Sequence, residues 1–160
     1  MARVLAGAVA LCVSLMLAAC ATAPLESQAK VQDPRQARVY FLRESTFLYS
    51  AGAAYLKVNG QEVGNVATGS YFFVDRPPGT YNVTLDSPLV PGRFAANLTV
   101  QPGSVYYLKI SPRTEHFFLG ATVGIIGQVI EASVVENSGA YSLTALDRST
   151  GTAMLASLQR

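Results

Sequence analysis

The residues best suited to a chemical reaction are Leu17 to Cys20, which read LAAC. A cysteine thiolate is a strong nucleophile, and the small side chains of Ala18 and Ala19 leave the adjoining peptide bond accessible. Other side chains that do chemistry are scarce, because the chain has a single histidine, His116. The spacing therefore favours covalent modification of Cys20 over catalysis by a cluster of residues.

No catalytic motif accompanies that cysteine. The sequence lacks the G-x-S-x-G nucleophile turn, the H-E-x-x-H metal motif, the phosphate-binding G-x-x-x-x-G-K-[ST] loop and the C-x-x-C pair. A metal site would need Glu115 and His116, which point to opposite faces of a strand. Asp75, Asp86 and Asp147 could form a carboxylate pair, but each adjoins a turn signal, where aspartate commonly caps the backbone. We therefore expect no catalytic residue, no metal and no cofactor.

The residues before Cys20 have the pattern of an export signal. Arg3 is their only charge, and Val4 to Ala19 form an apolar run a little shorter than the roughly 20 residues that a transmembrane helix needs. Two cleavage sites compete. Ala21 to Ala23 has the small-x-small form that ordinary signal peptidase accepts, but Pro24 directly after it is expected to block that enzyme.

LAAC resembles the lipobox of bacterial lipoproteins. That resemblance implies that diacylglycerol is attached to the thiol of Cys20, that the leader is cut between Ala19 and Cys20, and that the new amine receives a fatty acyl chain such as palmitate. At about 0.8 kcal/mol for each buried methylene, two or three chains hold a protein on a membrane. In lipoproteins of this type, an aspartate directly after the cysteine favours retention in the inner membrane. Here that residue is Ala21, which implies attachment to the outer membrane, facing the periplasm. The alternative is an ordinary leader cysteine in a chain that is secreted or keeps an uncleaved anchor.

The segment from Ala21 to Gln36 is polar, contains two prolines and shows no apolar periodicity. It predicts a flexible tether that spans on the order of 20 Å. Beyond the leader, 11 basic residues face 10 acidic ones, and the basic residues are scattered singly along the chain. Phosphate binding needs a clustered basic face, so we expect no nucleic-acid partner.

From Arg38 onward the hydrophobic period changes to two, which is typical of strands. Seven segments rich in β-branched and aromatic residues follow one another: 38–43, 54–59, 61–67, 70–75, 80–86, 94–100 and 104–110. Asn59-Gly60 suits a two-residue hairpin with positive φ at both positions, and Pro78-Gly79 and Pro102-Gly103 suit turns with proline first and glycine second. The pattern predicts antiparallel hairpins.

The expected strands differ in how their two faces alternate. Segments 80–86 and 94–100 each have one polar and one apolar face, which predicts an antiparallel β-sandwich. YFFV (71–74) and VYYL (105–108) are apolar on both faces. They predict central strands or a second layer that covers the sheet.

Gly69 to Leu85 reads GSYFFVDRPPGTYNVTL, with YLKVNGQEVGNV before it and PGSVYYLKI after it. Together these segments resemble a family of bacterial lipoproteins that carry a small domain of unknown function. More distantly, they resemble the transthyretin-like and carboxypeptidase-regulatory β-sandwiches, which share the PPGTY hairpin. The resemblance spans roughly residues 38–110. It implies a lipid-anchored β-sandwich, and Cys20 of the lipobox is the only functional residue that it carries over.

The last third of the chain has weaker patterns. Phe117 to Ile130 is uncharged and too short to span a bilayer, and Gly120 and Gly124 form a G-x-x-x-G pair. It predicts a glycine-rich connection packed on the sandwich or, alternatively, a patch that contacts a partner or a membrane. Asn137-Ser138 predicts the start of a short C-terminal helix that runs to about Leu146. Residues 151–159 fit a strand or a helix.

We thus expect a signal peptide (1–19), a lipidated cysteine and tether (20–36) and one β-sandwich domain (37–160). The expected function is a non-catalytic binding or assembly module at the outer membrane, with an envelope protein or polymer as partner. Arg76 and Arg93, at loop tips, are candidate contacts for an anionic partner. The alternatives are a hydrolase acting on an envelope polymer and an inhibitor or assembly accessory.

Overall fold

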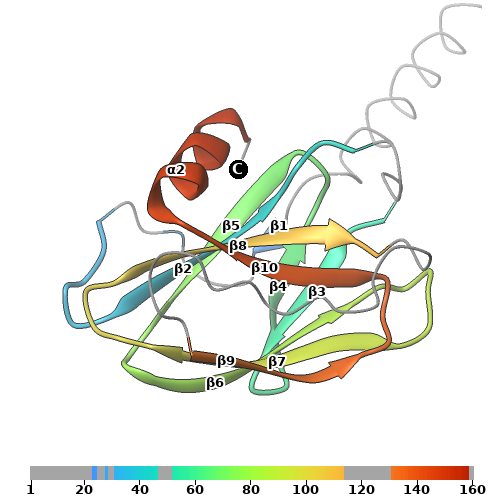
Figure 1. Cartoon of the computed structure of the whole chain (residues 1–160), viewed down its shortest axis with the longest axis horizontal. Coiled ribbons are helices and arrows are strands. Elements are labelled where there is room, and N and C mark those ends of the chain that lie inside the picture. Colours follow the sequence, from blue (N-terminus) through green and yellow to red (C-terminus); the bar gives the residue numbers. More distant parts are fainter. Residues whose placement is uncertain (1–22, 25–27, 29–30, 47–51, 114–130, 159–160) are drawn as a thin grey trace, which may run out of the picture.

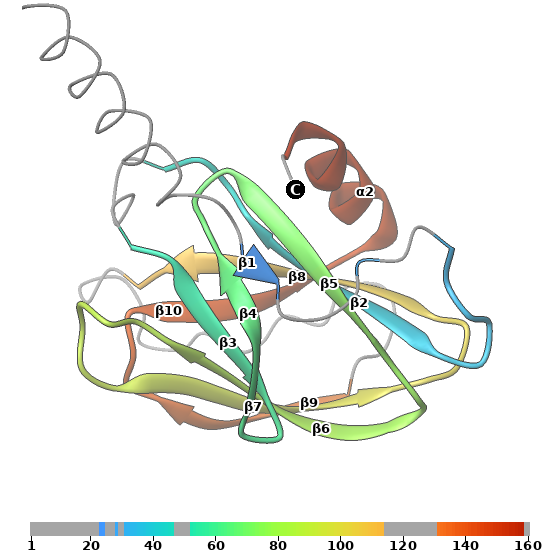
Figure 2. The same cartoon turned by 180° about the vertical axis from the view of Figure 1, so that it is seen from behind.

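The computed structural model describes residues 23–24, 28, 31–46, 52–113 and 131–158. Their strands form two sheets, with strand orders β1-β4-β3-β6-β7-β9 and β10-β8-β2-β5. The two sheets face each other, and one helix, α2, lies outside the four-stranded sheet (Figure 1; Figure 2 from behind). The expectation of a mainly β fold with two sheets and a short C-terminal helix is confirmed.

The elements of the six-stranded sheet are β1 (Ala23–Pro24), β3 (Ala54–Val58), β4 (Gln61–Val66), β6 (Gly79–Asp86), β7 (Arg93–Val100) and β9 (Glu131–Asn137). The elements of the four-stranded sheet are β2 (Ala37–Arg43), β5 (Ser70–Arg76), β8 (Val105–Pro112) and β10 (Tyr141–Leu146). All seven strands that the sequence predicts are present, and their bounds agree within two residues.

Two of the three expected turns have the expected backbone. Asn59 and Gly60 have φ values of 51° and 78°, so both residues occupy the left-handed region that a two-residue hairpin needs. At Pro102-Gly103, φ of the glycine is 69°, and the amide of Ser104 donates to the carbonyl of Gln101 at 3.3 Å.

The prediction of hairpins at the two Pro-Gly pairs is wrong. Gly79 has φ of 153° and is already the first residue of β6, so Pro78-Gly79 does not have the backbone of the expected turn. Each pair connects strands of different sheets, β5 to β6 and β7 to β8, and of the three turns only Asn59-Gly60 joins two strands that pair with each other.

The prediction of a wholly antiparallel sandwich is wrong in one place. Strands β2 and β8 pair in parallel, with Tyr40 opposite Tyr107. Every other described pair of strands is antiparallel. After β5 the chain crosses to the six-stranded sheet, forms β6 and β7 there, and returns to the four-stranded sheet as β8. Strand β8 then runs in the same direction as β2, so the four-stranded sheet is mixed.

The main core lies between the sheets. Alternate residues of each strand point inward, so that Phe41 of β2, Phe72 of β5 and Leu108 of β8 meet residues such as Leu56 and Leu85 of the facing sheet. These side chains are almost completely buried. Burial of apolar area at this interface supplies most of the stability of the fold.

The prediction of a helix from Asn137-Ser138 to Leu146 is wrong. Residues 131–137 and 141–146 form strands β9 and β10, and the helix α2 is Arg148–Ser157. Ser138 does not cap a helix, because its hydroxyl accepts a hydrogen bond from the amide of Arg93 at 3.2 Å and donates to Glu136 at 2.9 Å. Of the two alternatives for residues 151–159, the described residues up to Ser157 are helical.

A second, smaller hydrophobic cluster lies on the outer face of the four-stranded sheet. Tyr40 stacks on Tyr107 with ring centroids 5.4 Å apart, and Met154 of α2 packs with Tyr107 and Leu42. Phe73, on the same face, lies 5.3 Å from Tyr40. Helix α2 is thus the second covering layer that the two-sided apolar segments predict.

The described part of the N-terminal segment contacts both sheets. The backbone of Ala23–Pro24 pairs with Asn65 and Gly64 of β4. The side-chain amide of Gln28 donates to the carbonyl of Phe73 at 2.7 Å and accepts from its amide at 3.1 Å, along the outer side of β5. The segment that the sequence predicts to be a flexible tether therefore makes defined contacts with the domain at these positions.

Candidate functional site

The two sheets place their connections at two ends of the sandwich. The end that we call the β1 end is formed by residues 44–46, 67–69, 87–92 and 138–140, because β2, β4, β6 and β9 all finish there. The opposite end carries residues 33–36, 59–60, 77–78 and 101–104. Strand β1 runs antiparallel to β4, so Ala23, its first residue, is the one nearer the β1 end.

Arg43 closes the core at the β1 end. Its side chain is 0% exposed, although it is charged, and its Nη1 donates to the carbonyl of Gly52 at 2.6 Å and to that of Val66 at 2.9 Å. The guanidinium also lies 4.9 Å from the ring centroid of Tyr141. Desolvation by burial lowers the pKa of Arg43. The side chain thus links β2 and β10 of the four-stranded sheet to β4 of the six-stranded sheet.

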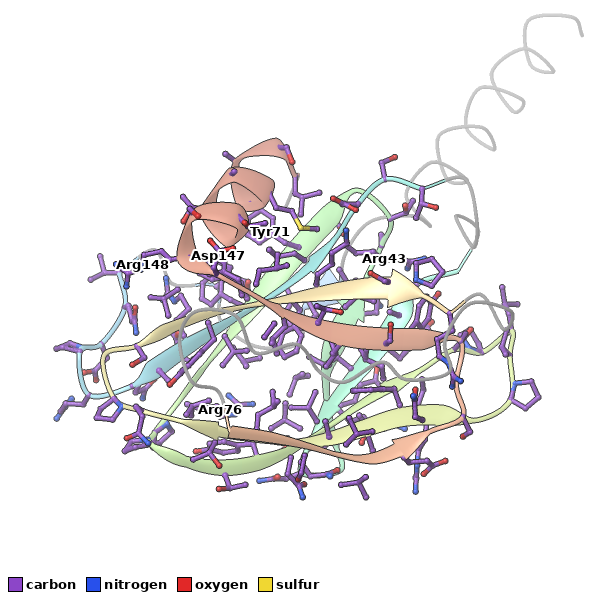
Figure 3. The ribbon with its side chains drawn as sticks, viewed as in Figure 1. Arg43, Tyr71, Arg76, Asp147 and Arg148 are labelled. Carbon is purple, nitrogen blue, oxygen red and sulfur yellow. The ribbon has the colours of Figure 1, made fainter. Side chains whose placement is uncertain are left out.

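Sequence reasoning did not single out Arg43. The signal is its position: Val39, Phe41 and Arg43 alternate along one strand and share the inward face. A positively charged side chain that follows inward-facing apolar residues on a strand lies either at the edge of the core or inside it with hydrogen-bond partners. Figure 3 shows Arg43 at the end of its strand, far from Arg76.

An open groove of about 570 Å³ lies beside this end, between the finish of α2 and the connections that follow β2 and β4. It is lined by Glu44, Ser45, Thr68, Gly69, Ser157 and Leu158. The hydroxyl of Thr68 accepts from the amide of Thr46 at 3.2 Å and donates to the carbonyl of Glu44 at 3.1 Å, which holds the two connections together. Its lining of hydroxyl groups suits hydrogen bonding to a polar partner.

The carboxylates at this end make contacts within the fold. Glu44 forms an ion pair with Lys109 at 2.6 Å, and Glu136 forms one with Arg93 at 2.6 Å across β7 and β9. The hydrogen bonds from Arg93 and Ser138 lower the pKa of Glu136, and the bond to Glu136 raises the pKa of Arg93. Arg113 donates to the backbone carbonyls of Asn137 and Gly139.

The connection between β6 and β7 is the most apolar part of the β1 end. Its residues 87–92 read SPLVPG and carry no charge. Leu89 is 66% exposed, whereas its neighbour Val90 packs against the core. In Figure 1 this connection, coloured between green and yellow, projects at the right-hand edge of the sandwich.

The structure separates the two arginines that the sequence offers as contacts. Arg76 ends β5 at the opposite end, where its Nη1 donates to the carbonyl of Asp75 at 2.9 Å. Arg93 begins β7 at the β1 end and is bonded to Glu136. The two side chains therefore do not belong to one binding site.

All three aspartates make contacts within the fold, but only Asp147 caps the backbone as its turn position predicts, whereas Asp75 and Asp86 pair with cations of neighbouring strands. Asp75 accepts two hydrogen bonds from the guanidinium of Arg38, at 2.8 and 2.7 Å. Asp86 forms an ion pair with Lys57 at 2.7 Å. Asp147 caps helix α2, since its carboxylate accepts from the amide of Thr150 at 3.0 Å.

Several predicted residues lie outside the part of the chain that the structure describes. They are Ala19, Cys20, Glu115, His116, Gly120 and Gly124, together with the whole of 117–130. Within the described residues, no group of three or more histidine, cysteine or acidic side chains could hold a metal ion. No described helix has the length and apolarity of a membrane span.

Comparison with known proteins gives one result. No curated protein and no solved structure matches the chain. A family model with the description "Protein of unknown function (DUF2846)" matches residues 33–121, from the turn before β2 through β8 and beyond. This match covers more than half of the 160 residues. The chain belongs to the DUF2846 family of proteins of unknown function.

Proposed function

We propose that this chain is a lipid-anchored, non-catalytic binding or assembly module of the bacterial outer membrane. The observation that carries the proposal is the LAAC sequence at Leu17 to Cys20. It closes an apolar run that follows the charge of Arg3, and it is followed by Ala21. This combination suits lipid transfer to the thiol of Cys20 and export to the periplasmic face of the outer membrane.

The contacts of the β1 end support binding rather than catalysis. Catalysis by acids and bases requires titratable groups that converge on a reacting atom. The carboxylates of Glu44 and Glu136 are instead bonded to Lys109 and Arg93, and half of the residues that line the groove beside Glu44 carry hydroxyl groups. Such a groove offers hydrogen bonds to a protein or polymer of the envelope.

Fractionation of cells that express the full chain tests the anchor. Cys20→Ser removes the thiol, and a serine hydroxyl does not replace it in lipid transfer, so we expect an unprocessed protein that leaves the outer-membrane fraction. Cys12→Ser is the matched control, because Cys12 lies inside the leader and its loss leaves processing unchanged. Normal processing and fractionation of the Cys20→Ser protein would refute the proposed anchor.

Fragmentation of the polymer tests the second half of the proposal. The purified full chain, incubated with isolated envelope polymer, is expected to sediment with it or with an envelope protein and to release no soluble fragments. If soluble fragments are released only when the protein is present, the chain is a hydrolase and the proposal of a non-catalytic module is refuted.

A further inference from the structure

We propose that residues 87–92, the β6–β7 connection, form a lipid-contacting loop that inserts Leu89 into the membrane surface beside the anchor. This inference rests on the proposed lipidation of Cys20. The position of the loop, its exposure, its hydrogen bonding and the contacts at its base support the proposal.

The position of the loop follows from the path of the chain. Ala23 pairs with Asn65, one residue before the end of β4, so β1 begins at the β1 end. Cys20 is three residues away, and three residues span at most about 11 Å. A lipid on Cys20 therefore keeps this side of the sandwich close to the membrane, and the β6–β7 connection belongs to the same end.

Its side chains suit an apolar boundary. Pro88, Leu89 and Pro91 are exposed, and no residue from Ser87 to Gly92 carries a charge. An exposed leucine between two exposed prolines gains free energy when it leaves water, and no ion has to be dehydrated with it. Arg93 adjoins the loop but is paired with Glu136, so Arg113, which donates to carbonyl groups at the same end, is the cation that this end offers to anionic headgroups.

The backbone of the loop also suits a medium that offers no hydrogen bonds. Proline has no amide hydrogen, so Pro88 and Pro91 present no donor. The amide of Leu89 donates to the hydroxyl of Ser87 at 3.2 Å. Pro88, Leu89 and Pro91 thus bring no unsatisfied amide donor into the interface, where each one would be costly.

Contacts at the base order the loop. Val90 packs against the core, whereas Leu89 is 66% exposed and touches the fold beside Gly52, where an added Cβ atom would lie 3.2 Å from its Cδ1. Gly92 has φ of +86°, and a Cβ atom at this glycine would lie 2.6 Å from the carbonyl oxygen of Ser138. The loop therefore reaches the membrane already ordered, and insertion costs little conformational entropy.

The test uses fluorescence of the lipidated full chain in vesicles of phosphatidylethanolamine and phosphatidylglycerol. The chain has no tryptophan, so Leu89→Trp creates a single probe, and Gln101→Trp places the matched control in an exposed turn at the opposite end. We expect emission from Leu89→Trp to shift to the blue and to be quenched by brominated lipid. Emission from Gln101→Trp should be quenched by iodide to the same extent with and without vesicles.

Each other outcome counts against the proposal. Quenching of Leu89→Trp by iodide alone overturns it, and shielding from both quenchers would assign the loop to a protein contact instead. If Leu89→Trp unfolds, a spin label on Leu89→Cys answers the same question through its collision rates with oxygen and with a water-soluble nickel complex. The acyl mass on Cys20 is measured on the same sample: its absence refutes the anchor as well, whereas its presence with a solvated Leu89 refutes the loop alone.

Discussion

Gly151 of helix α2 lies directly against the ring of Tyr107 in strand β8. A Cβ atom added to Gly151 would be 2.3 Å from Cγ and 2.5 Å from Cβ of the tyrosine, closer than such atoms approach in proteins. The helix backbone itself therefore covers the outer face of the four-stranded sheet. This contact gives the glycine a packing role inside a helix, where glycine is otherwise unfavourable.

Gly151→Ala is expected to lift α2 from the sheet. The added methyl group gains helix propensity but overlaps Tyr107, and overpacking of this kind typically costs about 1–3 kcal/mol in the free energy of unfolding. Denaturant unfolding measures the loss. Ala153→Ser, at an exposed position of the same helix, is the control and should change stability by less than about 0.5 kcal/mol. A more stable Gly151→Ala protein would contradict the close contact.

Asp75→Ala is expected to destabilise the fold strongly. Its carboxylate binds the guanidinium of Arg38, whose side chain is only 5% exposed and lies 3.9 Å from the centre of the Phe73 ring. Loss of one partner from a buried pair leaves the other charge poorly compensated and costs about 3 kcal/mol or more. Equilibrium unfolding in urea provides the measurement.

Two comparisons check that the cost comes from burial. Asp33→Ala removes a similar ion pair with Arg35, but that arginine is exposed, so the melting temperature should hardly change. The double variant Arg38→Met with Asp75→Leu replaces both charges by apolar groups and should regain much of the stability. Equal losses for Asp33→Ala and Asp75→Ala would show that burial is irrelevant here.

Asp147→Ala is expected to lower the melting temperature at neutral pH more than at acid pH. Hydrogen bonds from Ser149 and then from Thr150 lower the pKa of Asp147 below its ordinary value of 3.8. A carboxylate whose pKa is lowered by folding stabilises the protein above the pKa of the unfolded chain, and this contribution fades as pH falls further. The difference between the two proteins should therefore shrink below about pH 4.

Asp147→Asn separates capping from charge. Asparagine is a good N-cap, so this variant keeps an acceptor for the amide of Thr150 but has no group that titrates. It should melt between the wild type and Asp147→Ala at neutral pH, with a flatter pH dependence than the wild type. A gap between wild type and Asp147→Ala that is constant from neutral to acid pH would contradict the assigned pKa shift.

Arg43→Met is expected to loosen the β1 end. It removes hydrogen bonds to the carbonyls of Gly52 and Val66, and loss of the buried bond to Val66 costs about 1–3 kcal/mol, whereas the carbonyl of Gly52 still accepts from the hydroxyl of Tyr141 at 3.3 Å. Amide hydrogen exchange should rise at residues 52–54 and 66–69 and remain unchanged at the opposite end, for example at Ser104. An equal rise in the exchange rate along the whole described chain would show that Arg43 does not act locally.

The strands could be predicted from the sequence because alternation of apolar and polar residues directly reflects the geometry of a strand. Tyr81, Val83 and Leu85 alternate with polar residues in β6, and the turn at Asn59-Gly60 requires residues that tolerate positive φ. The parallel pairing of β2 with β8 could not be predicted in this way. Alternation specifies the faces of a strand and not its neighbour.

The C-terminal part shows why a local signal can mislead. Tyr141, Leu143 and Ala145 alternate as a strand should, yet the cap-forming residues Asn137 and Ser138 favour a helix there. In the fold, Ser138 bonds to Arg93, which is 45 residues away. Asp147 is the residue that caps the helix, and the glycine within that helix weakens its signal in the sequence.

The candidate site was harder to predict than the fold. Arg76 and Arg93 lie at the ends of strands rather than at the predicted loop tips, and only the topology shows that these strand ends are at opposite ends of the sandwich. The exposure of Leu89 likewise depends on the neighbouring Val90 pointing into the core. Both facts are tertiary and leave no trace in the local pattern.

Lipidation of Cys20 at the start of the mature chain is tested by mass spectrometry of the protein purified from its native membrane. We predict an N-terminal peptide that starts at Cys20 and has the added mass of diacylglycerol and a fatty acyl chain. A mature chain that starts at Pro24, or a Cys20 peptide without acyl mass, would contradict the account.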